Sequence, residues 1–114
     1  GSPNALKPRD FGRLMRRLHD GFHLRPEAEL AVELDPRGLT QDFIDVMQAC
    51  GINRASLGVQ TFDPAVQANV NRIQPFEQVL SNVEYTRVLV KGSSGVTIRP
   101  ENCCRTRRFV IKFM

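Results

Sequence analysis

The sequence predicts an α/β fold with parallel strands that forms part of a larger barrel or sheet. Two short, mostly apolar segments, residues 28–34 and 53–60, have the composition of buried parallel strands. Each is followed by a segment with helical periodicity, and such alternation indicates βα units joined by right-handed crossovers. Because strands of this type are apolar on both faces, we expect the sheet to extend beyond this pair.

A first helix is predicted ahead of the two strands. Pro8 suits the first turn of a helix and Gly21 suits its end. Between them apolar side chains recur every three or four residues, which is the spacing of an amphipathic helix. The apolar positions are Phe11, Leu14, Met15, Leu18 and Phe22.

Capping residues locate the helices that follow the strands. Thr40 is a side-chain N-cap for a helix that closes near Gly51, and Asp63 can cap a short helix over residues 64–69. Residues 76–90 form the last predicted helix. Its apolar positions are Val79, Leu80, Val83 and Val88.

Length and composition allow one small domain. The chain has 114 residues, of which 41% are hydrophobic and 25% charged. No apolar run approaches the ~18 residues of a membrane span, and no signal peptide opens the chain, so we expect a cytoplasmic protein without a membrane partner. The chain opens with Gly1 and its first Met is Met15, so we expect either an internal piece of a longer protein or a Gly1-Ser2 pair left by cloning.

Basic residues are concentrated towards the C-terminus. Residues 1–86 hold nine Lys and Arg against eleven Asp and Glu, whereas residues 87–114 hold seven against one. We therefore assign residues 1–90 to the α/β fold and residues 91–114 to a divergent basic tail. The tail interleaves Arg with Phe, as RNA-binding segments can, but short basic tails are usually solvated. We expect no nucleic-acid partner and keep RNA binding as an alternative.

Polar side chains lie where the predicted strands end, which is where parallel α/β folds bind ligands. Glu33 could accept hydrogen bonds from a ribose diol, and Gln60 could donate and accept at once. Arg72 could bind a carboxylate through two parallel bonds. Spacing alone leaves other roles open: Glu33 as a capping or solvated residue, Gln60 as a turn residue and Arg72 as a surface cation.

The cysteines and histidines predict no metal site. Cys50 stands alone, and Cys103 and Cys104 are adjacent, with no third ligand at a chelating spacing. His19 and His23 have no Cys or carboxylate at metal-ligand spacing. We therefore assign no metal ligand and no catalytic residue.

Four phrases in the sequence follow one another in a recognisable order. They are Ala31-Val-Glu-Leu-Asp-Pro-Arg37, Gly51-Ile-Asn-Arg-Ala-Ser-Leu-Gly-Val-Gln60, Phe62-Asp-Pro-Ala-Val-Gln67 and Val70-Asn-Arg-Ile-Gln-Pro-Phe76. Over residues 1–87 the chain thereby resembles the oxygen-independent coproporphyrinogen III oxidases, a family of radical S-adenosylmethionine enzymes. The related haem chaperones share the Leu-Gly-Val-Gln phrase and stay an alternative, although they usually lack the Glu-x-Asp-Pro-Arg wording.

The resemblance implies a radical-SAM partial TIM-like barrel and an S-adenosylmethionine site. Gly1 and Ser2 resemble the end of the family's glycine-rich loop and would meet the amino-acid end of the cofactor. Glu33 would hold the ribose hydroxyls. Gln60 and Arg72 would contact other polar groups, with Arg72 reaching the carboxylate.

The resemblance also implies a reaction, the oxidative decarboxylation of coproporphyrinogen III to protoporphyrinogen IX in haem synthesis by a monomeric enzyme. That reaction needs a 4Fe–4S cluster held by a Cys-x3-Cys-x2-Cys loop, which this sequence lacks. We expect the chain alone to be inactive, with a non-catalytic S-adenosylmethionine-binding module as an alternative. The family's next strand finds no match near residue 100, which suggests a frameshifted or fused tail.

Overall fold

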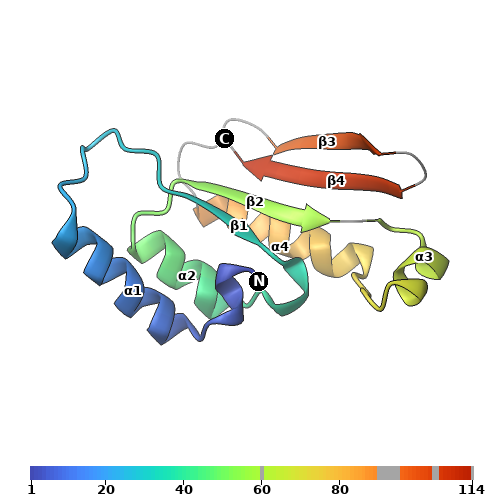
Figure 1. The fold of residues 1–114 in the computed structure, drawn as a ribbon, viewed down its shortest axis with the longest axis horizontal. Helices are drawn as coiled ribbons and strands as arrows, with labels where there is room; N and C mark the ends of the chain where they lie inside the picture. The colour runs from blue at the N-terminus through green and yellow to red at the C-terminus, as the bar shows by residue number, and fades with distance from the viewer. Residues whose placement is uncertain (60, 90–95, 104–105, 114) are drawn as a thin grey trace.

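The computed structural model describes the backbone of residues 1–59, 61–89, 96–103 and 106–113, and the side chains of residues 1–59 and 61–87. Figure 1 shows helices on one side of a single sheet. In chain order the elements are η1 (Pro3–Ala5), α1 (Pro8–Gly21), β1 (Ala31–Leu34), η2 (Pro36–Gly38), α2 (Gln41–Ala49), β2 (Arg54–Val59), α3 (Pro64–Asn69), α4 (Phe76–Leu89), β3 (Val96–Cys103) and β4 (Thr106–Phe113).

The sheet has the strand order β1-β2-β4-β3. β1 and β2 pair in parallel, as the sequence predicts, with Glu33 opposite Ser56 and Leu34 opposite Leu57. β3 and β4 form an antiparallel pair, and β4 also runs antiparallel to β2. The hairpin was not expected from the sequence, and it gives β2 a neighbour on each side.

The two faces of β2 differ in burial. Ala55, Leu57 and Val59 are fully buried, whereas Ser56 and Gly58 between them are only half-buried. Side chains alternate along a strand, so one face of β2 packs against the helices and the other carries small or polar residues. The expectation that both faces are apolar is therefore wrong for β2, and this second face leaves space for a pocket.

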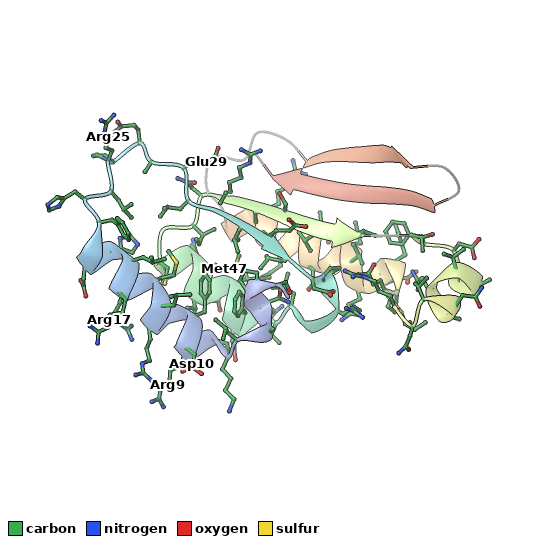
Figure 2. All side chains as sticks on the ribbon, viewed as in Figure 1. Arg9, Asp10, Arg17, Arg25, Glu29 and Met47 are labelled. Atoms are coloured by element: carbon green, nitrogen blue, oxygen red, sulfur yellow. The ribbon has the colours of Figure 1, made fainter. Side chains whose placement is uncertain are left out.

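Helix α2 provides the centre of the core. Its Phe43, Ile44 and Met47 are at most 2% exposed, and the ring of Phe43 lies 4.8 Å from that of Phe11 in α1. In Figure 2 Met47 lies inside the fold. The core is completed by Met15, Leu34, Leu39, Ile52, Ala55, Leu57, Val59, Val79 and Val83.

The predicted N-caps are confirmed. Thr40 Oγ1 accepts a hydrogen bond from the backbone N–H of Phe43 at 3.3 Å. Asp63 Oδ1 accepts from the N–H groups of Ala65 and Val66 at 2.9 and 3.2 Å. These bonds satisfy N–H groups that lack partners inside the helix, so the helices begin where the caps stand.

β1 is shorter than the predicted strand over residues 28–34. The side chain of Asn53 accepts a hydrogen bond from the N–H of Leu30 at 2.9 Å and donates to the carbonyl of Ala28 at 2.8 Å. The Asn53 side chain thus pairs with the N–H of Leu30 and the carbonyl of Ala28. The carbonyl of Leu30 accepts from the backbone N–H groups of Asn53 and Arg54 at 3.1 and 3.2 Å, and the regular ladder of β1 begins at Ala31.

Helix α1 buries less of its apolar face than its sequence predicts. Phe11 and Met15 are buried, but Leu14, Leu18 and Phe22 are 48%, 39% and 64% exposed. Helix α1 packs against α2 rather than against the sheet, and the described residues do not cover the rest of its apolar face. No helix in the described ranges is long and apolar enough to span a membrane.

Truncation of Met47 should destabilise the fold because its side chain has no exposed surface. We expect Met47→Ala to lower the free energy of unfolding by about 2–5 kcal/mol, the range for large-to-small substitutions in packed cores. Urea denaturation followed by circular dichroism measures the change. Leu14→Ala, at a half-exposed position, is the control and should cost about 1 kcal/mol or less. Equal losses for the two variants would contradict this packing.

Candidate functional site

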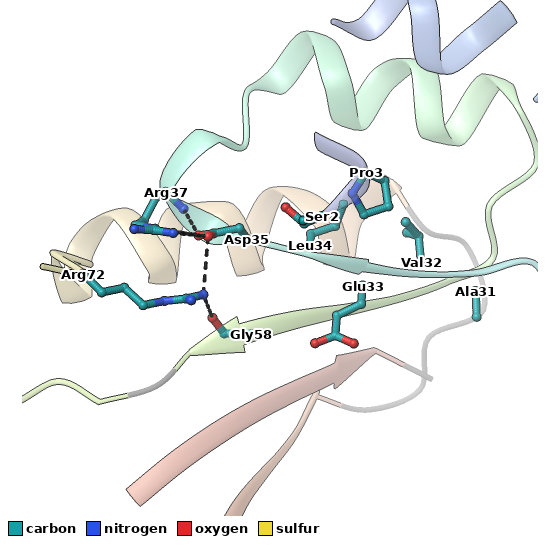
Figure 3. Close-up of a pocket in the computed structure, with 11 residues that line it drawn as sticks. Ser2, Pro3, Ala31, Val32, Glu33, Leu34, Asp35, Arg37, Gly58 and Arg72 are labelled. Atoms are coloured by element: carbon teal, nitrogen blue, oxygen red, sulfur yellow. Dashed lines mark hydrogen bonds and ion pairs between the residues drawn. The ribbon is translucent and has the colours of Figure 1, made fainter. Parts of the chain in front are cut away.

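A pocket of about 550 Å³ lies at the carboxyl ends of β1 and β2 (Figure 3). Gly1, Ser2, Glu33 and Arg72, which the sequence selected as cofactor-binding residues, all line it. The fifth, Gln60, directly follows β2 and lies outside the described residues. Residues far apart in the chain are thus brought together at the edge of the sheet where parallel α/β folds bind ligands.

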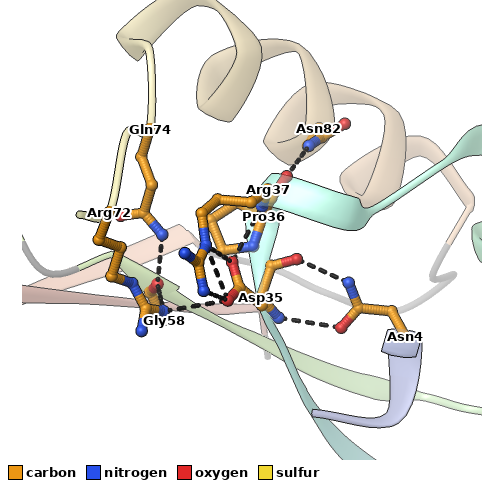
Figure 4. A network of polar contacts seen from close by, with 8 residues as sticks. All are labelled: Asn4, Asp35, Pro36, Arg37, Gly58, Arg72, Gln74 and Asn82. Atoms are coloured by element: carbon orange, nitrogen blue, oxygen red, sulfur yellow. Dashed lines mark hydrogen bonds and ion pairs between the residues drawn. The ribbon is translucent and has the colours of Figure 1, made fainter. Parts of the chain in front are cut away.

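The N-terminal segment is fixed beside the pocket by Asn4. Its amide nitrogen donates to the carbonyl of Asp35 at 2.7 Å, and its Oδ1 accepts from the backbone N–H of Asp35 at 3.0 Å (Figure 4). The side chain thereby satisfies both backbone groups of a residue at the end of β1. This pair of bonds holds Gly1 and Ser2 against the pocket.

Glu33 presents an exposed carboxylate to the pocket from β1. Within the described part of the chain, neither a hydrogen bond nor an ion pair to this carboxylate is found. Gly58 is a diagonal neighbour of Glu33 on β2, two residues beyond its partner Ser56, and an added Cβ there would stand 3.7 Å from Oε1 of Glu33. A glycine at this position keeps the space beside the carboxylate open to a ligand.

Asp35 is the centre of an ionic cluster at the edge of the pocket. Arg37 donates to it from Nη2 at 2.6 Å and from Nε to both carboxylate oxygens at 3.1 Å. Arg72 donates from Nη2 to Oδ2 at 3.3 Å. Hydrogen bonding to Arg37, aided by the charge of Arg72, lowers the pKa of Asp35 although its burial opposes this. Asp35 is therefore ionised at neutral pH.

The backbone at the end of α3 directs Arg72 towards the sheet. Asn71, directly after the C-cap residue Val70, has a positive φ of 50°, a conformation that Asn tolerates better than most residues. The N–H of Arg72 then donates to the carbonyl of Gln67 at 2.9 Å, and that of Asn71 to Ala68 at 3.1 Å. These two bonds form a Schellman motif, which reverses the chain at the point where Arg72 leaves the helix.

Two buried glutamines brace the loop that carries Arg72. Gln67 donates from Nε2 to the carbonyls of Thr61 and Gln74 at 2.7 and 3.0 Å, and its Oε1 accepts from the N–H of Gln74 at 3.0 Å. Gln74 Nε2 donates to the carbonyl of Gly58 at 3.4 Å. The loop is therefore bonded to itself and to the end of β2. Sequence reasoning missed both residues, since a Gln inside an apolar pattern carries no marker of its role.

Part of the Arg72 side chain remains exposed and available to a ligand. Its side chain is 28% exposed, and its Nη2 donates to the carbonyl of Gly58 at 3.4 Å as well as to Asp35. Its Nε is buried and has no hydrogen-bond partner among the described residues. A buried N–H without a partner is costly, so the fold holds Arg72 in this position at the expense of one hydrogen bond among the described residues. Arg72 is thus a tethered residue of the pocket wall rather than a solvated surface cation.

The described residues contain no group of three His, Cys, Asp or Glu that could hold a metal ion. Cys50 lines a separate hollow of about 590 Å³ beside α1 and α2. There Nε2 of His19 lies 3.0 Å from the carbonyl oxygen of Cys50. Burial raises the pKa of the Cys50 thiol, although Arg16 opposes this. The side chains of Cys103 and Cys104 lie outside the described residues. The described residues therefore do not fit an iron–sulfur cluster.

Comparisons with known proteins relate the chain to one superfamily. The model of the Radical SAM superfamily matches residues 1–102. The oxygen-independent coproporphyrinogen III oxidase of Bradyrhizobium diazoefficiens is 49% identical over 87 residues, which are 76% of this chain and 19% of that protein. The uncharacterized protein y4hJ of Sinorhizobium fredii is 40% identical over 87 residues, which are 76% of this chain and 34% of that protein.

A solved structure gives the same result. Coproporphyrinogen III oxidase from Escherichia coli, a radical SAM enzyme, matches with a TM-score of 0.77 and 36% identity. The match covers 82% of this chain and 21% of that one, so the chain spans about a fifth of the length of the oxidases that it resembles. The resemblance predicted from four sequence phrases is confirmed, and so is the partial barrel fold.

The ionic cluster predicts a specific acid sensitivity. Because folding lowers the pKa of Asp35, its carboxylate contributes stability that is fully present above about pH 4 and is lost as the pH falls through the folded value. We expect Asp35→Asn to lower the free energy of unfolding by about 1–3 kcal/mol at pH 7, and the difference from wild type to shrink below pH 4. Urea denaturation at pH 7 and pH 3 measures it. Asp20→Asn on the exposed side of α1 is the control, and a loss for Asp35→Asn that is independent of pH would contradict the prediction.

Proposed function

The chain belongs to the Radical SAM superfamily, and we propose that its pocket binds S-adenosylmethionine as part of an oxygen-independent coproporphyrinogen III oxidase. One observation carries the proposal. Glu33 of β1 and Arg72 after α3 line the same pocket, together with Gly1 and Ser2. A carboxylate, a guanidinium and a glycine-containing segment supply the groups that a nucleoside joined to an amino acid requires.

The ribose and the carboxylate of S-adenosylmethionine each have a matching residue. The two oxygens of Glu33 can accept hydrogen bonds from the two ribose hydroxyls. Arg72 can pair with the carboxylate through the N–H groups that Asp35 and Gly58 do not take. Gly1 and Ser2 would lie along the amino-acid end. We assign Gln60, outside the described residues, to the remaining polar groups.

The pocket suits this cofactor in size and in its unsatisfied groups. Its volume of about 550 Å³ lies within the ordinary range of small-molecule sites. Gly58 leaves the space beside Glu33 open, and the Arg72 side chain keeps 28% of its surface exposed. When bound, S-adenosylmethionine supplies radical chemistry that no amino-acid side chain provides.

We assign the oxidative decarboxylation to the whole parent enzyme. That reaction converts propionate side chains of coproporphyrinogen III to the vinyl groups of protoporphyrinogen IX in porphyrin and haem synthesis. It is an oxidoreductase reaction that needs a 4Fe–4S cluster, and the described residues include no ligand set for one. The contribution of this chain is therefore to bind and orient the cofactor, and we expect the 114 residues alone to be inactive.

A binding measurement tests the proposal. Isothermal titration calorimetry of the full chain should detect S-adenosylmethionine, and Glu33→Gln should weaken binding by about 10-fold or more, because each hydrogen bond to the charged carboxylate is worth about 1.5–3 kcal/mol. Glu29→Gln is the matched control, since Glu29 pairs with Arg54 and does not line the pocket.

Thermal unfolding of each variant separates loss of binding from loss of fold. Two results would count against the proposed site. One is a folded wild-type chain that does not bind S-adenosylmethionine, and the other is a Glu33→Gln variant that binds it as tightly as wild type.

A further inference from the structure

We propose that Asp35 is a positioning residue that holds the guanidinium of Arg72 in place for the carboxylate of S-adenosylmethionine. The inference rests on the proposed function of the pocket and assigns a role to a residue that does not need to touch the ligand. It also explains why two arginines share one carboxylate at the edge of the pocket (Figure 4).

The backbone of Asp35 is fixed from two sides. Asn4 bonds both its N–H and its carbonyl, at 3.0 and 2.7 Å. The next residue, Pro36, accepts a hydrogen bond at its carbonyl from Nδ2 of Asn82 in α4 at 3.0 Å. Asp35 is thus held between the N-terminal segment and a core helix, so its carboxylate is a rigid point of attachment.

The two arginines use this carboxylate differently. Arg37 makes several short contacts to both oxygens, the closest at 2.6 Å. Arg72 makes one contact, from Nη2 to Oδ2 at 3.3 Å. Arg72 is therefore oriented by Asp35 without a full two-bond pair, and its Nε has no partner among the described residues.

Because Arg37 takes most of the hydrogen bonds of Asp35, the positive charge of Arg72 is left available to a ligand. Arg37 already balances the single negative charge of Asp35, so the cluster of Asp35, Arg37 and Arg72 carries one net positive charge. Without Arg37, Asp35 would be free to take both hydrogen bonds of a parallel pair from Arg72, and that guanidinium would have less to offer a ligand. Holding Arg72 in its binding orientation reduces the side-chain entropy that is lost when the carboxylate binds.

A comparison of two ligands tests the role of Asp35. The probes are S-adenosylmethionine and decarboxylated S-adenosylmethionine, which has a hydrogen in place of the carboxylate. By calorimetry at pH 7, Asp35→Asn should weaken binding of S-adenosylmethionine by about 10-fold and change that of the decarboxylated ligand by less than about twofold. Asp35→Glu should restore part of the lost affinity. Arg72→Gln should weaken binding in the same ligand-dependent way, and adding Asp35→Asn to it should cause no further loss, because both changes act on one interaction.

A matched control is Asp45→Asn, which removes a carboxylate that accepts a hydrogen bond from Tyr85 at 3.0 Å outside the pocket. It should leave both affinities unchanged. Equal losses for the two ligands in Asp35→Asn would overturn the inference, because a general disturbance of the pocket ignores the ligand carboxylate. Unchanged affinity for both ligands would overturn it too.

The failure of the proposed function can be distinguished from the failure of this inference. If the folded wild-type chain binds neither ligand, the proposed function fails, and NMR of the Arg72 Nε–H resonance then tests the positioning role without a ligand. Faster hydrogen exchange at this group in Asp35→Asn than in wild type and Asp45→Asn would support the role. An unchanged exchange rate would overturn it.

Discussion

The arrangement of the pocket depends on the ion pairs of one carboxylate, that of Asp35. It links η2, through Arg37, to the loop after α3, through Arg72. The backbone of the same residue binds the N-terminal segment through Asn4. Asp35 therefore joins segments that are distant in the chain at the end of β1, beside the pocket.

The register of the sheet determines which side chains can face the pocket. Leu34 is 1% exposed in the core, so its neighbour Glu33 must point to the opposite face of β1. A shift of one residue would bury the Glu33 carboxylate and expose Leu34, which makes such a shift costly. On β2 the same alternation buries Leu57 and leaves Gly58 beside Glu33. Core packing thus also aligns the binding face.

Local signals in the sequence were sufficient for the helices and for part of the site. Thr40 and Asp63 cap helices where predicted because a side-chain cap depends on residues only two or three positions away. Glu33 and Arg72 were found by their chemistry near strand ends and by family resemblance. The contact between Asp35 and Arg72 was not, because it joins residues 37 positions apart. The exposure of Leu14 and the antiparallel strand β4 likewise depend on which elements pack together.

The fold fixes Arg72 at the wall of the pocket, even though its buried Nε has no hydrogen-bond partner among the described residues. Leaving a buried N–H without a partner costs about 1–3 kcal/mol, and an extended, solvated arginine would avoid that cost. The Schellman motif at Asn71 fixes the backbone of Arg72, and the hydrogen bond to Asp35 fixes its guanidinium. The side chain is therefore kept from extending into solvent. Part of the Arg72 side chain stays exposed at the pocket wall in this fixed orientation. A guanidinium that is already oriented loses less side-chain entropy when it pairs with a carboxylate, so the fold itself prepares Arg72 for the ligand proposed above.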